Sequence, residues 1–214
     1  MPLQSHDLEA EADDRQLHRL LFFTDAVFAI VLTLLALELK APEGGTPAEM
    51  VRNLARMTGD FVAFGGSFAL VGIWWMAHMA SLRRLARFDW TVAVLNLIFL
   101  LTVCLIPFST SLISHGRFAG VPWAIYCWNQ IFTSGLMVIM NLAVGRDGGR
   151  LLSGMSERGR LHAILGPGTP GVAFTVSLLI MKFADPKWAT LALLLIPLGN
   201  LAPYLFVRRE AAAQ

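Results

Sequence analysis

Six stretches of the sequence, each about 20 residues long, consist almost entirely of apolar side chains. A helix needs roughly 20 such residues to cross the hydrocarbon core of a bilayer, which is about 30 Å thick. Charged residues make up only 15% of the chain, against about 25% in soluble domains. We therefore predict an all-α integral membrane protein in which residues 1–214 form one domain of six transmembrane helices. The helices are expected near residues 17–39, 61–81, 90–114, 119–143, 161–182 and 187–207, after an N-terminal segment at 1–16.

The distribution of Lys and Arg in the connecting segments predicts the orientation of these helices. Of the 17 Lys and Arg residues, 11 fall on the side that holds both termini and 6 on the other. Positively charged loops favour the cytoplasmic side of a membrane, so we expect both termini to lie in the cytoplasm. The first residues are acidic and polar, unlike the start of a cleaved signal peptide, so the first helix is expected to remain as a span.

Several functional classes have no support in the sequence. No basic cluster is interleaved with aromatic residues, as a surface that binds nucleic acid would require. No nucleophile–base pair and no set of residues with metal-ligand spacing is present, so we expect neither an enzyme nor a cofactor. Cys104 and Cys127 lie in apolar sequence and are expected to be packing residues.

The first predicted span, "RLLFFTDAVFAIVLTLLALELK", combines a long apolar run with one acid and one hydroxyl. At 100° per residue, a stripe about 100° wide contains Ile30, Thr33, Leu34 and Leu37. Asp25 falls on nearly the opposite face. The pattern predicts a helix with two functions, one face offering aliphatic rings with a hydroxyl layer and the other presenting an acid to neighbouring helices. By itself, the aliphatic stripe is also compatible with a face that packs in the core or against lipid.

Asp25 needs hydrogen-bonding partners or a proton, because an ionised carboxylate in hydrocarbon costs several kcal/mol. His78 on the second helix and Asn96 on the third lie about as deep as Asp25, roughly 8–10 Å from the cytoplasmic ends at 1.5 Å per residue. We therefore expect a buried polar cluster, joined by Arg19 and by the indole of Trp74 or of its neighbour Trp75. It could be purely structural, it could bias a moving helix through protonation, or it could serve a proton-coupled transporter.

Three of the predicted helices carry the motifs of a known family. The segment "RLLFFTD" at 19–25 resembles the R-x-x-x-F-S-D signature that opens the first helix of the lysosomal potassium channel family, the transmembrane protein 175 family, and of its bacterial relatives. The pattern W-x-x-x-H at 74–78 resembles the second helix, and "LNLIFLLTVCLIPFSTSLI" at 95–113 is similar to the third. Thr24 stands where the family usually has Ser, which keeps the hydroxyl and adds a methyl group.

This resemblance implies a bacterial inner-membrane protein that assembles in the bilayer as a homotetramer, with the first helices around a central pore. Potassium ions would be the permeant species, and no other metal or cofactor is implied. Ile30 and Leu37 fall on the hydrophobic constriction positions of the family, Leu34 is a further pore-facing candidate, and Thr33 falls on the hydroxyl layer linked to selectivity for potassium over sodium. The remaining motif residues are expected in the packing network around the pore helix: Arg19, Phe23, Thr24, Asp25, Trp74, His78 and Asn96.

No T-V-G-Y-G carbonyl filter is present, so we expect selectivity to rest on hydroxyl groups and to be modest, and gating to occur by dewetting of the aliphatic rings. The proton-coupled transporter remains the alternative function. Three further features have structural interpretations. Asn129, Gln130 and Asn141 are expected to form interhelical hydrogen bonds. The run "GPGTPG" at 166–171 indicates either a broken helix at a transport site or a kinked helix start satisfied by its neighbours. Residues 46–57 are expected to form a short amphipathic surface helix.

Overall fold

The computed structural model describes residues 5–83, 85, 87–115, 120–147, 165–184 and 186–196. The described elements are helical. They are α1 (Ser5–Leu37), α2 (Pro47–Arg56), α3 (Thr58–Leu82), α4 (Trp90–Cys104), α5 (Ile106–His115), α6 (Gly120–Asp147), the 3₁₀ turn η1 (Gly166–Gly168), α8 (Thr169–Phe183) and the 3₁₀ segment η2 (Pro186–Leu194).

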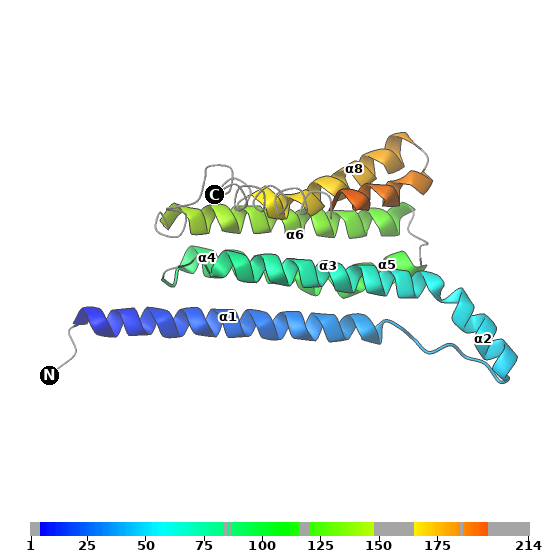
Figure 1. The fold of residues 1–214 in the computed structure, drawn as a ribbon, viewed down its shortest axis with the longest axis horizontal. Helices are drawn as coiled ribbons and strands as arrows, with labels where there is room; N and C mark the ends of the chain where they lie inside the picture. Colours follow the sequence, from blue (N-terminus) through cyan, green and yellow to red (C-terminus); the bar gives the residue numbers. More distant parts are fainter. Residues whose placement is uncertain are drawn as a thin grey trace, which may run out of the picture.

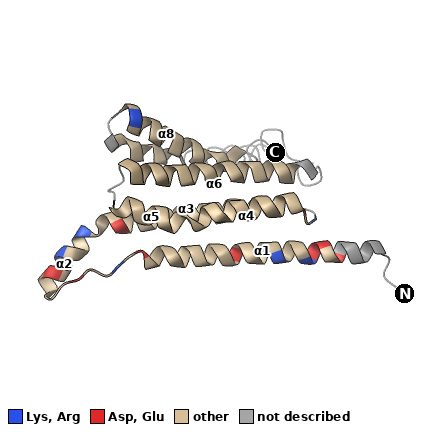
Figure 2. Ribbon diagram, turned by 180° about the vertical axis from the view of Figure 1, so that it is seen from behind, with Lys and Arg blue, Asp and Glu red and all other residues tan. Residues whose placement is uncertain are grey.

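The long helices lie nearly side by side in successive layers (Figure 1). α1 forms one outer layer, α3, α4 and α5 form the next, α6 follows, and α8 with η2 lies farthest from α1. Most of the charged residues that Figure 2 colours lie near the two ends of these layers, in the N-terminal part of α1 and around α2. The middle of each layer is uncharged apart from an acid in α1, as expected for helices surrounded by hydrocarbon.

Four helical stretches among the described residues are long and apolar enough to cross a membrane, namely Glu11–Leu37, Thr58–Leu82, Trp90–His115 and Gly120–Gly145. They correspond to the first four predicted spans. α1 is longer than predicted, because its helix already begins at Ser5. On its surface, Arg15 forms an (i, i+4) ion pair with Glu11 at 3.3 Å, and His18 Nδ1 lies 3.5 Å from Asp14 Oδ2 at the same spacing; such contacts support the helix beyond the apolar run.

The last two predicted spans lie partly outside the described residues. The span predicted at 161–182 corresponds to η1 and α8, and its residues 161–164 are not described. The span predicted at 187–207 is a 3₁₀ segment over Pro186–Leu194 rather than the expected α-helix, and its residues 197–207 are not described. The predicted count of six therefore stays a prediction.

The third predicted span is divided into α4 and α5 at a single residue, Leu105. Pro107 lies two residues further on, and its ring nitrogen cannot donate to the carbonyl of Val103. The Leu105 N–H instead bonds to the carbonyl of Thr102 at 3.3 Å, a tighter turn than that of an α-helix. The apolar run is thus continuous in sequence, while the helix is interrupted where proline removes a donor.

The Gly/Pro run at the start of α8 is satisfied by α6. The Ser134 hydroxyl donates to the Pro167 carbonyl at 2.8 Å and accepts the backbone N–H of Gly171 at 3.0 Å. A Cβ at position 171 would lie 2.6 Å from the Ser134 oxygen, so only glycine permits this close approach. Of the two interpretations of this run, the structure supports a helix start satisfied by its neighbour.

Candidate functional site

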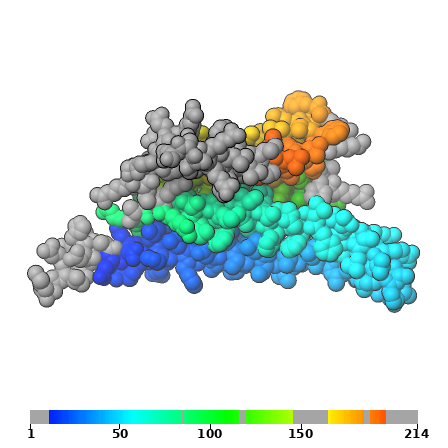
Figure 3. Space-filling model, viewed as in Figure 1, coloured from blue at the N-terminus to red at the C-terminus, as the bar shows by residue number. Residues whose placement is uncertain are grey.

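α1 has two apolar faces with opposite exposure. Phe28, Val31 and Leu35 are each at most 1% exposed and belong to the core of the subunit. On the other side, Ile30 is 57% exposed and Leu37 is 74% exposed. The stripe predicted from the sequence therefore points away from the helices of its own subunit, along the outer edge that α1 forms in Figure 3. It does not pack in the core of the subunit.

Thr33 presents its oxygen on this exposed face. Its hydroxyl donates to the carbonyl of Ile30 in the same helix at 2.7 Å. A hydroxyl has one hydrogen and two lone pairs, so once the hydrogen is used within the helix, the lone pairs remain available as acceptors. Leu34, 41% exposed, borders the same face. The surface of α1 therefore combines aliphatic side chains with one layer of outward-facing oxygen acceptors.

Three of the predicted network residues join α1, α3 and α4 through a directed chain of hydrogen bonds. His78 Nε2 lies 2.6 Å from Asn96 Oδ1, and Asn96 Nδ2 donates to Thr24 Oγ1 at 2.9 Å. The Thr24 hydroxyl donates in turn to the Leu20 carbonyl at 2.9 Å. Because Asn96 Oδ1 can only accept, His78 Nε2 carries a proton in this arrangement. The chain ends at a backbone carbonyl, so within the described residues it does not continue across the membrane as a relay would.

Apolar and aromatic packing encloses this chain. Thr24 and Asn96 are both 0% exposed, and His78 is 2% exposed. The His78 ring stacks on Phe99 at 5.4 Å between centroids and lies 5.9 Å from the ring of Phe28. Buried polar groups without partners are costly in such surroundings, so this satisfied network fixes α1 against α3 and α4 at one level.

Asp25 is placed differently from the prediction. It is exposed within the subunit, and its Oδ1 accepts a hydrogen bond from the Trp75 indole at 2.9 Å. Thr24, not Asp25, bonds to Asn96. Equal depth was the basis for predicting that Asp25 joins His78 and Asn96, but successive residues on a helix differ by 100° in direction, and depth does not determine direction.

Three other predicted network residues also lie outside this chain. Trp74 donates its indole N–H to Gln130 Oε1 at 3.1 Å and so links α3 to α6. Arg19 is exposed and makes no hydrogen bond or ion pair among the described residues. Phe23 is 48% exposed and, seven residues before Ile30, lies on the exposed face rather than in the subunit interior.

A second set of interior hydrogen bonds, centred on α6, was predicted only in part. Gln130, Asn129 and Asn141 form interhelical bonds with α3 and α5, which confirms that prediction. Ser67 and Ser81 of α3, which also bond to α6, were not singled out, although Ser67, Trp74 and Ser81 recur every seven residues along α3. Each of the three bonds a polar side chain of α6: Tyr126, Gln130 and Asn141 respectively. This spacing was the signal in the sequence for a polar contact between parallel helices.

The chain is similar to proteins of a known family. Residues 19–107 match the model of the family described as endosomal/lysosomal potassium channel TMEM175. The chain is 32% identical over 169 residues to a protein of Chamaesiphon minutus named potassium channel, covering 72% of this chain and 81% of that protein. It is 33% identical over 125 residues to a Streptomyces collinus protein also named potassium channel, covering 56% of this chain and 57% of that protein.

A solved structure shares the fold. It is the crystal structure of a lysosomal potassium-selective channel TMEM175 homolog from Chamaesiphon minutus, which superposes with a TM-score of 0.65 at 25% sequence identity. The match covers 87% of this chain and 99% of that chain. The similarity therefore extends over nearly the whole of the solved chain, whereas the matched segment spans little more than half of the Streptomyces relative.

Proposed function

This chain belongs to the TMEM175 channel family, and on that basis we propose that four copies form a cation pore that prefers potassium over sodium. The pore lies between the subunits, and its wall is the exposed face of α1. The protein spans the bacterial inner membrane with both termini in the cytoplasm, as the excess of Lys and Arg on that side favours. The relatives named potassium channel support the choice of ion.

The observation that carries this proposal is the face of α1 that contains Ile30, Thr33 and Leu37. It is exposed in the single subunit, while the opposite face is buried against α3, α4 and α5. Lipid could cover this face as well, just as Thr175 on α8 has an exposed hydroxyl bonded within its own helix, so the choice of a pore also rests on the channel family to which the chain belongs. If this face lies next to a fourfold axis, the pore along the axis contains water and ions that the hydroxyls can bind. The aliphatic side chains of the four subunits then form rings around it.

In this arrangement the two kinds of side chain have separate roles. Four Thr33 oxygens replace part of the hydration shell of a potassium ion, and sodium is disfavoured because it holds its water more tightly. Selectivity is modest, because four hydroxyls coordinate an ion less completely than stacked rings of carbonyls do. The rings of Ile30 and Leu37, with Leu34 at the border, exclude water when the pore is narrow and so close it by dewetting.

Recordings from purified protein in planar bilayers under a potassium gradient test this function. We expect discrete unitary currents. With potassium on one side of the bilayer and sodium on the other, their reversal potential should be shifted from zero toward the equilibrium potential of potassium. A proton-coupled carrier, the alternative function, gives saturating flux without unitary steps. Saturating flux of that kind, or unitary currents that do not distinguish the two cations, would contradict the proposal.

A further inference from the structure

α2 and the loop before it project beyond α1. In Figure 1, α2 slants away from the N-terminal start of α3. It extends past the level of α1, on the side away from α3, α4 and α6. Figure 3 shows the same protrusion at the end of the molecule. This is also the side to which the exposed face of α1 points, because the buried face of α1 contacts α3, α4 and α5. α2 therefore extends toward the space that borders the exposed side chains of Ile30 and Leu37.

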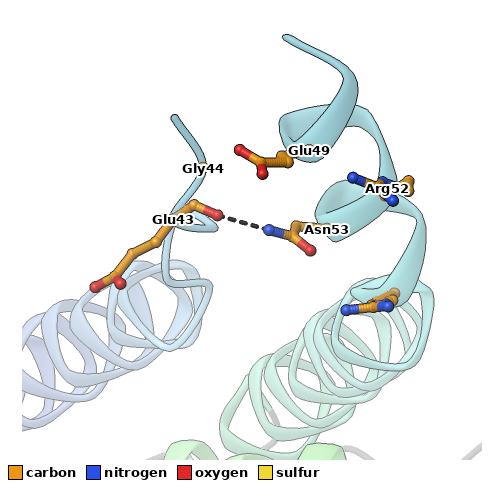
Figure 4. A pocket seen from close by; sticks show the side chains of 6 residues that line it. Glu43, Gly44, Glu49, Arg52 and Asn53 are labelled. Carbon is orange, nitrogen blue, oxygen red and sulfur yellow. Dashed lines mark hydrogen bonds between the residues drawn. The ribbon is translucent and has the colours of Figure 1, made fainter. Parts of the chain in front are cut away.

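The loop and α2 are fixed to each other. Glu49 accepts the backbone N–H groups of Gly45 at 3.2 Å and Thr46 at 3.1 Å, and Thr46 caps the helix in return. The Asn53 amide donates to the backbone carbonyl of Glu43 at 2.6 Å, a bond that Figure 4 draws as a dashed line. A Cβ on Gly44 would lie 3.2 Å from the backbone nitrogen of Met50, so the loop packs closely on the helix. The backbone that carries these charged residues is therefore fixed against α2.

These charges are numerous and form no ion pairs within the described residues. A pocket between loop and helix is lined by Glu43, Gly44, Glu49, Arg52, Asn53 and Arg56 (Figure 4). Residues 38–60 hold four acids and three bases, a net charge of 3 − 4 = −1 per subunit. In the described part of the chain, none of these seven residues forms an ion pair. α2 has no buried residue. We call residues 38–60 the rim.

We propose that the rims of four subunits surround the α2 end of the pore, where their fixed charges set the local concentration of permeant cations. This inference rests on the pore proposed above. With a net charge of −1 per subunit, four rims carry −4 and attract cations, and the arginines reduce this attraction. Fixed charges act over about a Debye length, roughly 10 Å in 0.1 M salt and 3 Å in 1 M salt.

Two single substitutions test the rim by unitary potassium conductance at about 20 mM and about 1 M KCl. In low salt, Glu43→Gln is expected to reduce the conductance about threefold and Arg52→Gln to raise it by a similar factor, because the Debye length then exceeds 10 Å. Both effects disappear in 1 M KCl. The ratio of potassium to sodium permeability stays unchanged, because local concentration affects both monovalent cations equally. Glu43 is suitable because its backbone, not its carboxylate, holds Asn53.

Lys182→Gln is the matched control. Lys182 is also an exposed cation, but it lies on α8, in the layer farthest from α1. Its replacement is expected to leave the conductance unchanged at both salt concentrations. Equal low-salt conductance in wild type, Glu43→Gln and Arg52→Gln would overturn the rim proposal while the pore stands, and so would an effect of Lys182→Gln as large as theirs. Wild-type protein without unitary currents would overturn the pore and the rim together.

Discussion

Replacing Leu37 by Asn is expected to raise the resting potassium conductance at least about tenfold, equivalent to removing about 1.4 kcal/mol from the barrier. Leu37 is 74% exposed on the face of α1 proposed to line the pore, so four copies would form one aliphatic ring. An amide binds water where the isobutyl group repels it, so the narrow part of the pore should stay wet. Macroscopic currents at zero stimulus, normalised to the amount of protein in the membrane, measure the effect.

Leu179→Asn is the control for this prediction. Leu179 is 50% exposed and lies on α8, away from α1. The same change of side chain there is expected to leave the resting conductance within twofold of wild type, which corresponds to a change of at most about 0.4 kcal/mol in the barrier. Unchanged or reduced conductance in Leu37→Asn, from protein that still assembles, would argue against a hydrophobic gate at this ring.

Replacing Thr33 by Val is expected to bring the ratio of potassium to sodium permeability close to one. Val has nearly the shape of Thr but carries a methyl group in place of the hydroxyl, so four acceptors are removed from the pore wall while the branched shape is kept. The hydrogen bond to the Ile30 carbonyl is also lost, but that carbonyl remains within a continuous helix. The shift of the reversal potential when external potassium is exchanged for sodium measures the ratio.

A second exposed threonine, whose hydroxyl also donates to a carbonyl of its own helix, serves as the control. Thr175 is exposed, and its hydroxyl donates to the Gly171 carbonyl of its own helix at 2.8 Å, as that of Thr33 does to Ile30. Because Thr175 lies on α8, Thr175→Val should leave the reversal potential where it is in wild type. If Thr33→Val retained the wild-type ratio, selectivity would have to arise elsewhere in the pore.

The helices could be predicted well where sequence and local geometry agree. The apolar runs placed α3 and α6 within a few residues of Thr58–Leu82 and Gly120–Asp147. The amphipathic pattern at 46–57 correctly predicted α2. The break at Leu105 was not predicted, because hydropathy does not register the donor that Pro107 lacks. The 3₁₀ segment η2 was missed for a similar reason, since an apolar composition does not distinguish a 3₁₀ helix from an α-helix.

The direction of side chains was harder to predict than their depth. Asp25 was placed beside His78 and Asn96 from its depth, its angle on the helix and the family motif, yet the adjacent Thr24 bonds Asn96, and Asp25 bonds only the Trp75 indole among the predicted partners. Both faces of α1 are apolar, so hydropathy could not decide which one packs against α3 and α4. The decision follows from tertiary contacts, in which Phe28 and Leu35 fill the core and leave Ile30 and Leu37 outside.

The central claim is that the exposed face of α1 lines a water-filled pore, and thiol accessibility tests it most directly. The exposed native thiol is first removed by Cys104→Ala, and one cysteine at a time is then introduced by Leu37→Cys and, as a control on α8 away from α1, by Leu179→Cys. A positively charged methanethiosulfonate reagent in water is expected to block most of the potassium current of Leu37→Cys and none of that of Leu179→Cys. Currents in Leu37→Cys that persist at full size under the reagent would contradict the pore assigned to this face.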